Sequence, residues 1–279
     1  MAALSTSSGA AEHRLNAIIS LVSEEVVKLP PLRKMSFQQR KRFTIDLALI
    51  GLPLRTGYLV DVIAPEDAVA VFGRLIVGLR RTCSEFDAVA HIYESNTEQS
   101  FFVNVPMLLG QRNPDDQGYT HGVSFVHLGI DVPYSLVPNP PSDVTDALLS
   151  LVDDATIQPS LPPSITIRKR LQPETAVPLA AVLLEYPVAY IPASLKHPFL
   201  SNVSLDVYEC TVEFEPNTPH SLVKFSCPSY LARSHPDVLA PSRIIASLTE
   251  KFGTRVRKMA PGTPLDVVHT TRTLDRVAL

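Results

Sequence analysis

The chain has few cysteines, no long apolar run and little net charge, and each of these shortages argues against one class of protein. Its three cysteines, Cys83, Cys210 and Cys227, are too few and too scattered for a disulfide framework or a structural zinc site. No apolar run is long enough to cross a membrane, and no signal peptide is visible. A formal net charge of −3 is not the basic footprint of a general nucleic-acid binder. We therefore expect buried thiols in an intracellular protein, cytoplasmic or nuclear, that enters no membrane and is not built to bind nucleic acid.

Common catalytic and cofactor motifs are also missing. Gly73 and Gly78 have the spacing of a phosphate loop, but the Lys-Ser/Thr that should follow is absent and the surrounding pattern is helical. No Gly-x-Ser-x-Gly sequence marks a nucleophile, and no His-Glu-x-x-His, paired Cys-x-x-Cys or aspartate-rich calcium loop occurs. His121 and His127, the closest histidines, would lie roughly 20 Å apart on one extended strand. The sequence thus predicts no cofactor and no metal site.

The composition is that of a globular protein, with 45% hydrophobic and 19% charged residues. Apolar residues at helical spacing predict helices over residues 12–30, 37–51, 65–81 and 241–253, and a short helix from Ser142. Ser36 and Gln39 match a capping box before the second helix. Runs of strand length lie at residues 58–63, 88–93, 99–105 and 123–128, and the turn residues between the middle two predict a hairpin.

The centre of the fold is expected in the C-terminal half. The most apolar stretch, 179–191, the alternating stretch 203–214 and the run 221–227 are interpreted as three neighbouring strands in the middle of one sheet. The alternation changes phase once, so a bulge near Val207 and Tyr208 is expected. One strand–helix–strand step followed by consecutive strands favours an α+β fold with a mixed, largely antiparallel sheet and helices packed on it.

Proline marks the one predicted interruption of this fold. Five prolines within residues 154–178 argue against a long helix or a central strand, so we expect an irregular excursion with an edge strand near Ile165–Ile167. We predict a single domain over residues 11–255 that includes this proline-rich excursion. A disordered N-terminal tail over 1–10 and a loose C-terminal tail over 256–279 complete the chain.

Two of three candidate catalytic residues lie in strand-like runs. Asp61 could line a ligand crevice at the end of a sheet strand, but the favoured interpretation is that it faces outward or helps to cap the next helix. His127 shares strand parity with Val123 and Phe125, and Asp131 follows closely. A His–Asp pair could support general base chemistry, yet no nucleophile is identifiable, so a hydrogen-bonded structural histidine is the favoured interpretation.

The third candidate, Glu185, interrupts the most apolar stretch of the chain. As a buried carboxylate it could act as a general acid or base. Pro187 follows closely, and a strand that breaks there would leave Glu185 at an exposed bend, which is the favoured alternative.

Three basic groups, at residues 40–42, 168–170 and 255–258, would support nucleic-acid binding only if they formed one surface stripe. Each is more simply interpreted as ordinary solvated surface.

One set of segments is similar to a known family. Tyr186–Tyr190, Leu200–Tyr208 and Phe225–Pro228, with looser agreement at Gly57–Asp61, resemble an uncharacterised eukaryotic family named for a human chromosome-one open reading frame. Its members carry a domain of unknown function. The resemblance rests on packing and turn residues. It implies an intracellular protein with the family's fold, and it brings no activity and no catalytic residues.

We expect a soluble intracellular binding or interaction module without a cofactor. Its partners are expected to be proteins that contact the proline-rich excursion or the loop near residues 113–120, because function concentrates in long loops on a rigid scaffold. The alternative hypothesis is a hydrolase or transferase with a site formed by Asp61, His127 and Glu185. Convergence of these three side chains in one pocket would favour the enzyme.

Overall fold

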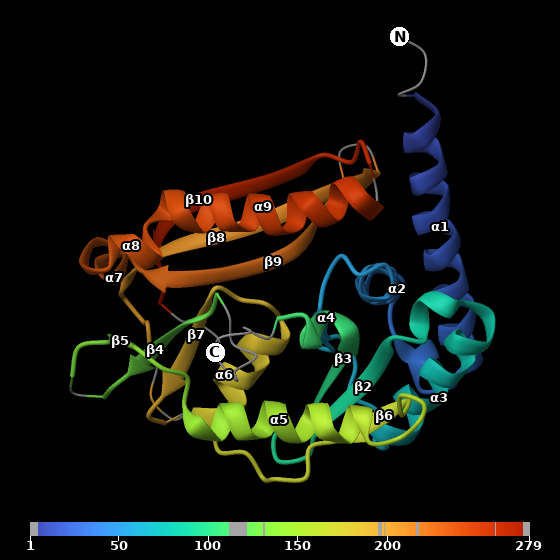
Figure 1. The fold of residues 1–279 in the computed structure, drawn as a ribbon, viewed down its shortest axis with the longest axis horizontal. Coiled ribbons are helices and arrows are strands. Elements are labelled where there is room, and N and C mark those ends of the chain that lie inside the picture. The colour runs from blue at the N-terminus through green and yellow to red at the C-terminus, as the bar shows by residue number, and fades with distance from the viewer. Residues whose placement is uncertain are drawn as a thin grey trace. The chain divides into compact units, whose positions relative to one another are not determined.

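The computed structural model describes residues 5–111, 122–130, 132–194, 197, 199–215, 218–259 and 261–275 (Figure 1). The chain divides into two compact units, and the single domain over 11–255 stays a prediction from the sequence. The N-terminal unit comprises Met1–Tyr119 and Asp146–Arg170, and the C-terminal unit comprises Thr120–Thr145 and Leu171–Leu279. The chain passes from the N-terminal to the C-terminal unit for the last time between Arg170 and Leu171, inside the proline-rich excursion. Each unit combines helices with a sheet, and the predicted α+β class is confirmed.

The N-terminal unit packs helices on a four-stranded mixed sheet. The main helices are α1 (Ser5–Lys28), α2 (Phe37–Gly51) and α3 (Ala68–Thr82), with the short α4 (Val105–Leu109) and most of α5 (Ser142–Thr156). Each of the first three was predicted, although α1 begins within the segment expected to be disordered. The capping box is confirmed, because the Ser36 side chain accepts a hydrogen bond from the Gln39 backbone and the Gln39 side chain accepts one in return.

The strand order of this sheet is β1 (Gly57–Leu59), β3 (Gln99–Asn104), β2 (Val89–Glu94) and β6 (Ser164–Thr166). The predicted hairpin is confirmed, since β2 and β3 pair antiparallel. The predicted edge strand is also confirmed: among the described strands β6 stands at the end of the sheet and pairs with β2 alone, in parallel, with Ile165 opposite Ile92. The strand expected over 58–63 ends at Leu59, so Asp61 falls in the following loop.

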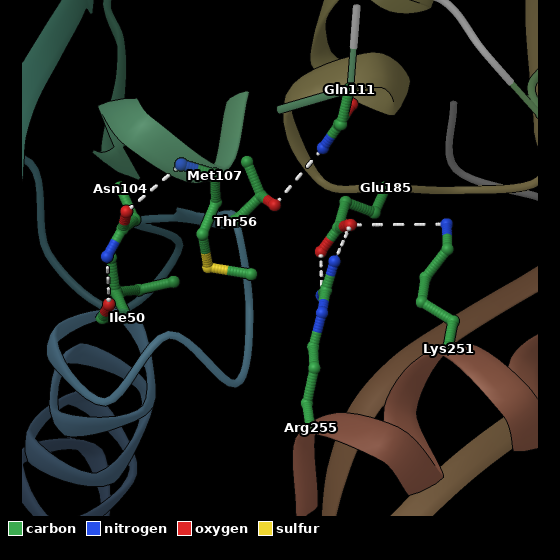
Figure 2. Close-up of polar contacts among 8 residues, drawn as sticks. All are labelled: Ile50, Thr56, Asn104, Met107, Gln111, Glu185, Lys251 and Arg255. Carbon is green, nitrogen blue, oxygen red and sulfur yellow. Dashed lines mark hydrogen bonds and ion pairs between the residues drawn. The ribbon is translucent and has the colours of Figure 1, made fainter. Parts of the chain in front are cut away.

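Asn104 joins three elements of the N-terminal unit (Figure 2). Its Oδ1 accepts a hydrogen bond from the Met107 backbone and thereby caps α4, while its Nδ2 donates to the Ile50 carbonyl of α2 at 3.0 Å. Close by, Gln111 Nε2 donates to Thr56 Oγ1 at 3.1 Å. Buried polar groups that are satisfied in this way fix the path of the chain where β3 turns into α4.

Gly51 is needed where α2 meets the buried ring of Phe86, because a Cβ there would lie 3.0 Å from Phe86 Cζ. Gly51→Ala is therefore expected to lower the free energy of unfolding by about 1–3 kcal/mol through overpacking. Gly73→Ala in α3 is the matched control, since its Cβ would meet Ser164 Cβ at an ordinary 3.5 Å and helix propensity favours alanine. Urea unfolding followed by circular dichroism compares the two, and an equal effect would contradict the packing argument.

The C-terminal unit contains two sheets. One is antiparallel, in the order β10 (Leu265–Thr273), β8 (Ser204–Glu215) and β9 (Thr218–Pro228); the other is mixed, in the order β5 (Ser135–Val137), β4 (Ser124–Leu128) and β7 (Val188–Pro192). Its helices are α6 (Pro173–Leu183), α7 (Ser229–Ser234), α8 (Pro236–Leu239) and α9 (Pro241–Met259). Helix α9 runs past Gly253, which does not terminate it but brings α9 close to Leu265 of β10.

The predicted three-stranded centre was wrong. Residues 173–183 form helix α6, and within the apolar stretch 179–191 only residues 188–191 are extended, as part of β7. Helix α6 starts with Pro173 in its first turn, where proline is tolerated, and it accommodates Pro178 at the loss of one backbone hydrogen bond. Strand β7 pairs with β4, whereas β8 and β9 form a hairpin in the other sheet, so the three segments share no single layer.

Two further expectations about this unit differ from the structure. Residues 265–273 of the expected loose tail pair with β8 along their whole length. The irregularity in β8 lies between Cys210 and Thr211 and again between Glu213 and Glu215, not at Val207 and Tyr208. Asp206 and Tyr208 consequently share the face that is buried. None of the described helices is long and apolar enough to cross a membrane.

Candidate functional site

Asp61 is an exposed residue of the N-terminal unit. Its Oδ2 accepts a hydrogen bond from Arg42 Nη2 at 3.0 Å, and both side chains are about half exposed, at 47% and 58%. Asp61 therefore faces outward, and its carboxylate is engaged by Arg42. An ion pair this exposed contributes at most about 1 kcal/mol and is screened by salt.

Glu185, in the C-terminal unit, was expected at an exposed bend, and the structure places it at a buried one. It follows the end of α6 with a φ of 61°, and the backbone N–H groups of Glu185 and Tyr186 donate to the carbonyls of Val182 and Ala181. This pattern is a Schellman motif, whose left-handed position glycine usually occupies. A glutamate there adopts a backbone conformation that is unfavourable for residues other than glycine. The interactions of its side chain must offset that conformational free energy.

The compensation is a buried ion cluster (Figure 2). Arg255 of α9 donates from both terminal nitrogens to the two carboxylate oxygens of Glu185, each at 2.7 Å, and Lys251 Nζ lies 4.0 Å away. The Glu185 side chain is only 2% exposed. Burial lowers the pKa of Lys251, and the Glu185 charge opposes that shift. With both oxygens engaged by guanidinium donors, Glu185 joins α9 to the end of α6 and is poorly placed to accept a substrate proton.

His127 lies on β4, half-buried, opposite Ser135 of β5 and Ile191 of β7. Glu185 precedes the start of β7, whereas Ile191 lies near its end, so the β4–β7 ladder holds His127 and Glu185 at opposite ends. Asp131, the expected partner of His127, is outside the described residues. The structure thus does not bring His127 and Glu185 into one site, and Asp61 belongs to the other unit.

A buried histidine that the sequence analysis did not single out is His91 of β2. Its Nδ1 lies 2.7 Å from Ser164 Oγ, and its ring packs against Phe72 and Phe102 at centroid distances of 5.0 and 5.7 Å. Burial lowers the pKa of His91 to about 3. A serine beside a histidine suggests nucleophilic catalysis, but activation needs an imidazole that can carry a proton. His91 lies among aromatic rings and no carboxylate contacts it in the described part of the chain, so the pair is structural.

The cysteines likewise offer no nucleophile. Cys83, Cys210 and Cys227 are buried and free, as expected. Burial raises the pKa of Cys83 to about 11 and the pKa of Cys210 and Cys227 to about 12. Thiols with such pKa values remain protonated and unreactive at neutral pH. Nor do the described residues include any group of three or more His, Cys, Asp or Glu side chains that could hold a metal ion.

The outer face of α3 forms one wall of an open groove in the N-terminal unit. Its apolar side, with Phe72, Ile76 and Leu79, is fully buried. The opposite side lines a cavity of about 650 Å³ together with Pro163 and Ser164 of the proline-rich excursion. We call this cavity the α3 groove; its lining residues are Glu25, Val69, Ala70, Gly73, Arg74, Val77, Gly78, Arg81, Pro163 and Ser164.

Gly73 and Gly78, which have the spacing of a phosphate loop, shape this groove. Gly73 lets β6 approach α3, since its Cβ would lie 3.5 Å from Ser164 Cβ. A Cβ on Gly78 would lie only 2.5 Å from Glu25 Oε2, so the absent side chain makes room for that carboxylate. Glu25 in turn forms an ion pair with Lys28. The motif therefore serves close packing of α1, α3 and β6 around the groove.

Arg74 and Arg81 give the groove a basic rim. They stand two turns apart on α3, about 10 Å along the helix axis, and both are exposed. Arg74 Nε donates to the Ala70 carbonyl at 3.2 Å, and neither arginine has a carboxylate partner among the described residues. The groove thus combines a floor of small apolar residues, the Glu25 carboxylate that is paired with Lys28, and two arginines that are available to an acidic ligand.

Comparison with protein-family models, with curated proteins and with solved structures found no match. The resemblance to the uncharacterised family therefore stays a prediction from the sequence.

Proposed function

We propose that the chain is an intracellular binding or interaction module, without a cofactor, whose α3 groove binds a short partner segment that carries both apolar and acidic side chains. The observation that carries this proposal is the pairing of a floor of small apolar residues with the two arginines on its rim. The groove also uses Pro163 and Ser164, so it includes part of the proline-rich excursion expected to contact partners.

The size of the groove supports a ligand of a few side chains. A volume of about 650 Å³ lies within the range of small-ligand sites. Each apolar side chain buried there would contribute about 1.5–3 kcal/mol, and each exposed arginine–carboxylate pair up to about 1 kcal/mol. Against the cost of association, this supports weak, reversible binding with a dissociation constant on the order of 100 µM.

The hydrolase or transferase hypothesis has less support. It requires Asp61, His127 and Glu185 to act together, whereas Asp61 is engaged by Arg42, Glu185 is engaged by Arg255, and His127 lies at the far end of its ladder from Glu185. The geometry favours the binding module.

A synthetic peptide tests the proposal directly. A dye-labelled 12-residue peptide of glutamate and leucine should bind the full chain in fluorescence anisotropy with a dissociation constant on the order of 100 µM. A peptide with lysine in place of glutamate should not bind. The variant Arg74→Glu/Arg81→Glu should weaken binding about tenfold or more, because each rim charge is reversed.

Arg170→Glu is the matched control, since Arg170 is exposed in the same unit but does not line the groove. It makes the same arginine-to-glutamate change at one position, half the change of charge of the double variant, and should leave the affinity unchanged. Equal binding of both peptides, or equal effects of the groove and control variants, would contradict a basic-rimmed docking site.

A further inference from the structure

Strand β10 is a long outer strand of the C-terminal unit. Its nine residues pair with β8 on one side, and no described strand pairs with its other side, as the outer position of β10 in Figure 1 shows. In an antiparallel ladder, alternate residues direct their backbone N–H and C=O groups away from the neighbouring strand. β10 therefore presents a row of backbone donors and acceptors along its outer side.

This edge lacks most of the features that usually block pairing, although it carries two charged residues, Asp266 and Arg272. Soluble proteins protect exposed strands with proline, lysine, bulges or very short length. β10 contains neither proline nor lysine, and its register with β8 runs without a shift from Leu265 to Thr273. Val268 is 45% exposed on the open face. A regular, unprotected edge of this length favours addition of another strand.

The side chains of β10 indicate which strand fits. Asp266, Val268, Thr270 and Arg272 share one face, with an acid near one end and a base near the other. Neither Asp266 nor Arg272 has an ion-pair partner among the described residues. An antiparallel copy of the same strand, centred on His269, places each Asp266 opposite the other copy's Arg272. Centring on Val268 or Thr270 instead leaves Asp266 opposite an uncharged residue.

His269 does not obstruct this centre. Its ring stacks on Tyr208 of β8 at a centroid distance of 4.9 Å, and its Nε2 lies 3.2 Å from Asp206 Oδ1. The side chain is thus held on the covered face of its own sheet, whereas the proposed charge pairs form on the open face.

We propose that two copies of this chain associate through antiparallel pairing of β10 about His269, which joins their three-stranded sheets into one sheet in the order β9-β8-β10-β10-β8-β9. The occupant of the edge is a second copy because the charge pattern is complementary to itself in this one register. The interface uses the C-terminal unit alone, so it is independent of the α3 groove.

Sedimentation equilibrium of the full chain from about 1 to 500 µM tests the proposal, with a dimer dissociation constant on the order of 10 µM expected. Asp266→Arg and Arg272→Asp should each weaken the dimer about tenfold or more, because like charges then stand opposite each other twice. The combined variant Asp266→Arg/Arg272→Asp restores opposite charges and should restore the dimer.

Asp237→Arg, at an exposed position of α8, is the matched control and should leave the association unchanged. Circular dichroism of each variant confirms that the monomer is folded. A chain that stays monomeric at 500 µM, or a combined variant no tighter than the single ones, would overturn the proposal.

Discussion

Replacing Glu185 by glutamine is expected to lower the free energy of unfolding by about 3 kcal/mol. The change keeps the shape of the side chain but leaves Arg255 and Lys251 without their buried counter-charge. Breaking a buried ion pair typically costs about 3–5 kcal/mol, and the lower end applies because Arg255 is 21% exposed and regains some hydration. The strained backbone at Glu185 is retained in the variant, so the loss reports the charge alone.

Glu209→Gln provides the matched control, since Glu209 forms an exposed ion pair with Lys224 on β9. Its loss is expected to be below about 1 kcal/mol. Urea unfolding at pH 7 measures both, and the combination Glu185→Gln/Arg255→Gln should be less destabilising than the sum of its parts. Similar losses for the buried and the exposed glutamine variants would refute the role of Glu185 as an anchor for α9.

Lowering the pH from 6.5 to 4.5 is expected to cost about 2 kcal/mol of stability through His91 alone. Burial among Phe72 and Phe102 lowers the pKa of His91 to about 3, against about 6.5 in the unfolded chain. Below pH 6.5 the unfolded state therefore binds a proton that the folded state excludes. The stability is fully present above pH 6.5 and falls by about 1.4 kcal/mol per pH unit until pH reaches about 3.

The variant His91→Phe/Ser164→Ala isolates this effect because it removes the titrating ring and the hydroxyl that contacts it. Any cost of repacking is a constant offset, and the other titrating groups act equally in both proteins. The difference in unfolding free energy between the variant and the original chain should shift in favour of the variant as the pH falls from 6.5 to 4.5. A difference that does not change with pH would contradict a neutral, buried His91.

Local signals made the helices predictable. The capping box of Ser36 and Gln39 and the apolar periodicity of α1, α2 and α3 depend on residues within a few positions of one another. The hairpin of β2 and β3 is equally local, because its turn lies between two short apolar runs. These elements fix the α+β class without knowledge of distant contacts.

Which distant segments of the chain pack or pair with one another could not be predicted from such local signals. The stretch 179–191 is apolar enough for a strand, yet its first half completes α6, and strand β10 comes from a segment dismissed as a tail. Glu185 was assigned to an exposed bend because Pro187 suggested one. Glu185 is buried against Lys251 and Arg255, which lie more than sixty positions later in the chain. The sequence near Glu185 therefore does not indicate them.

The candidate site did leave a signal that the sequence analysis overlooked. Gly73 and Gly78 were tested only as a phosphate loop, although Ala70, Gly73 and Val77 recur at helical spacing opposite the buried face of α3. Small residues on an outer helical face indicate close approach by another element or a groove. The arginine pair at the same spacing adds the charge that this groove presents.

The most direct measurement of the central claim uses a photoreactive benzoylphenylalanine at Ala70, an exposed position of the α3 groove, in the full chain inside cells. Mass spectrometry should identify crosslinked partner segments that combine apolar and acidic residues. These crosslinks should disappear with Arg74→Glu/Arg81→Glu and persist with Arg170→Glu. Crosslinks to segments without acidic residues, or an identical set after reversal of both rim charges, would contradict the account of this groove as the docking site.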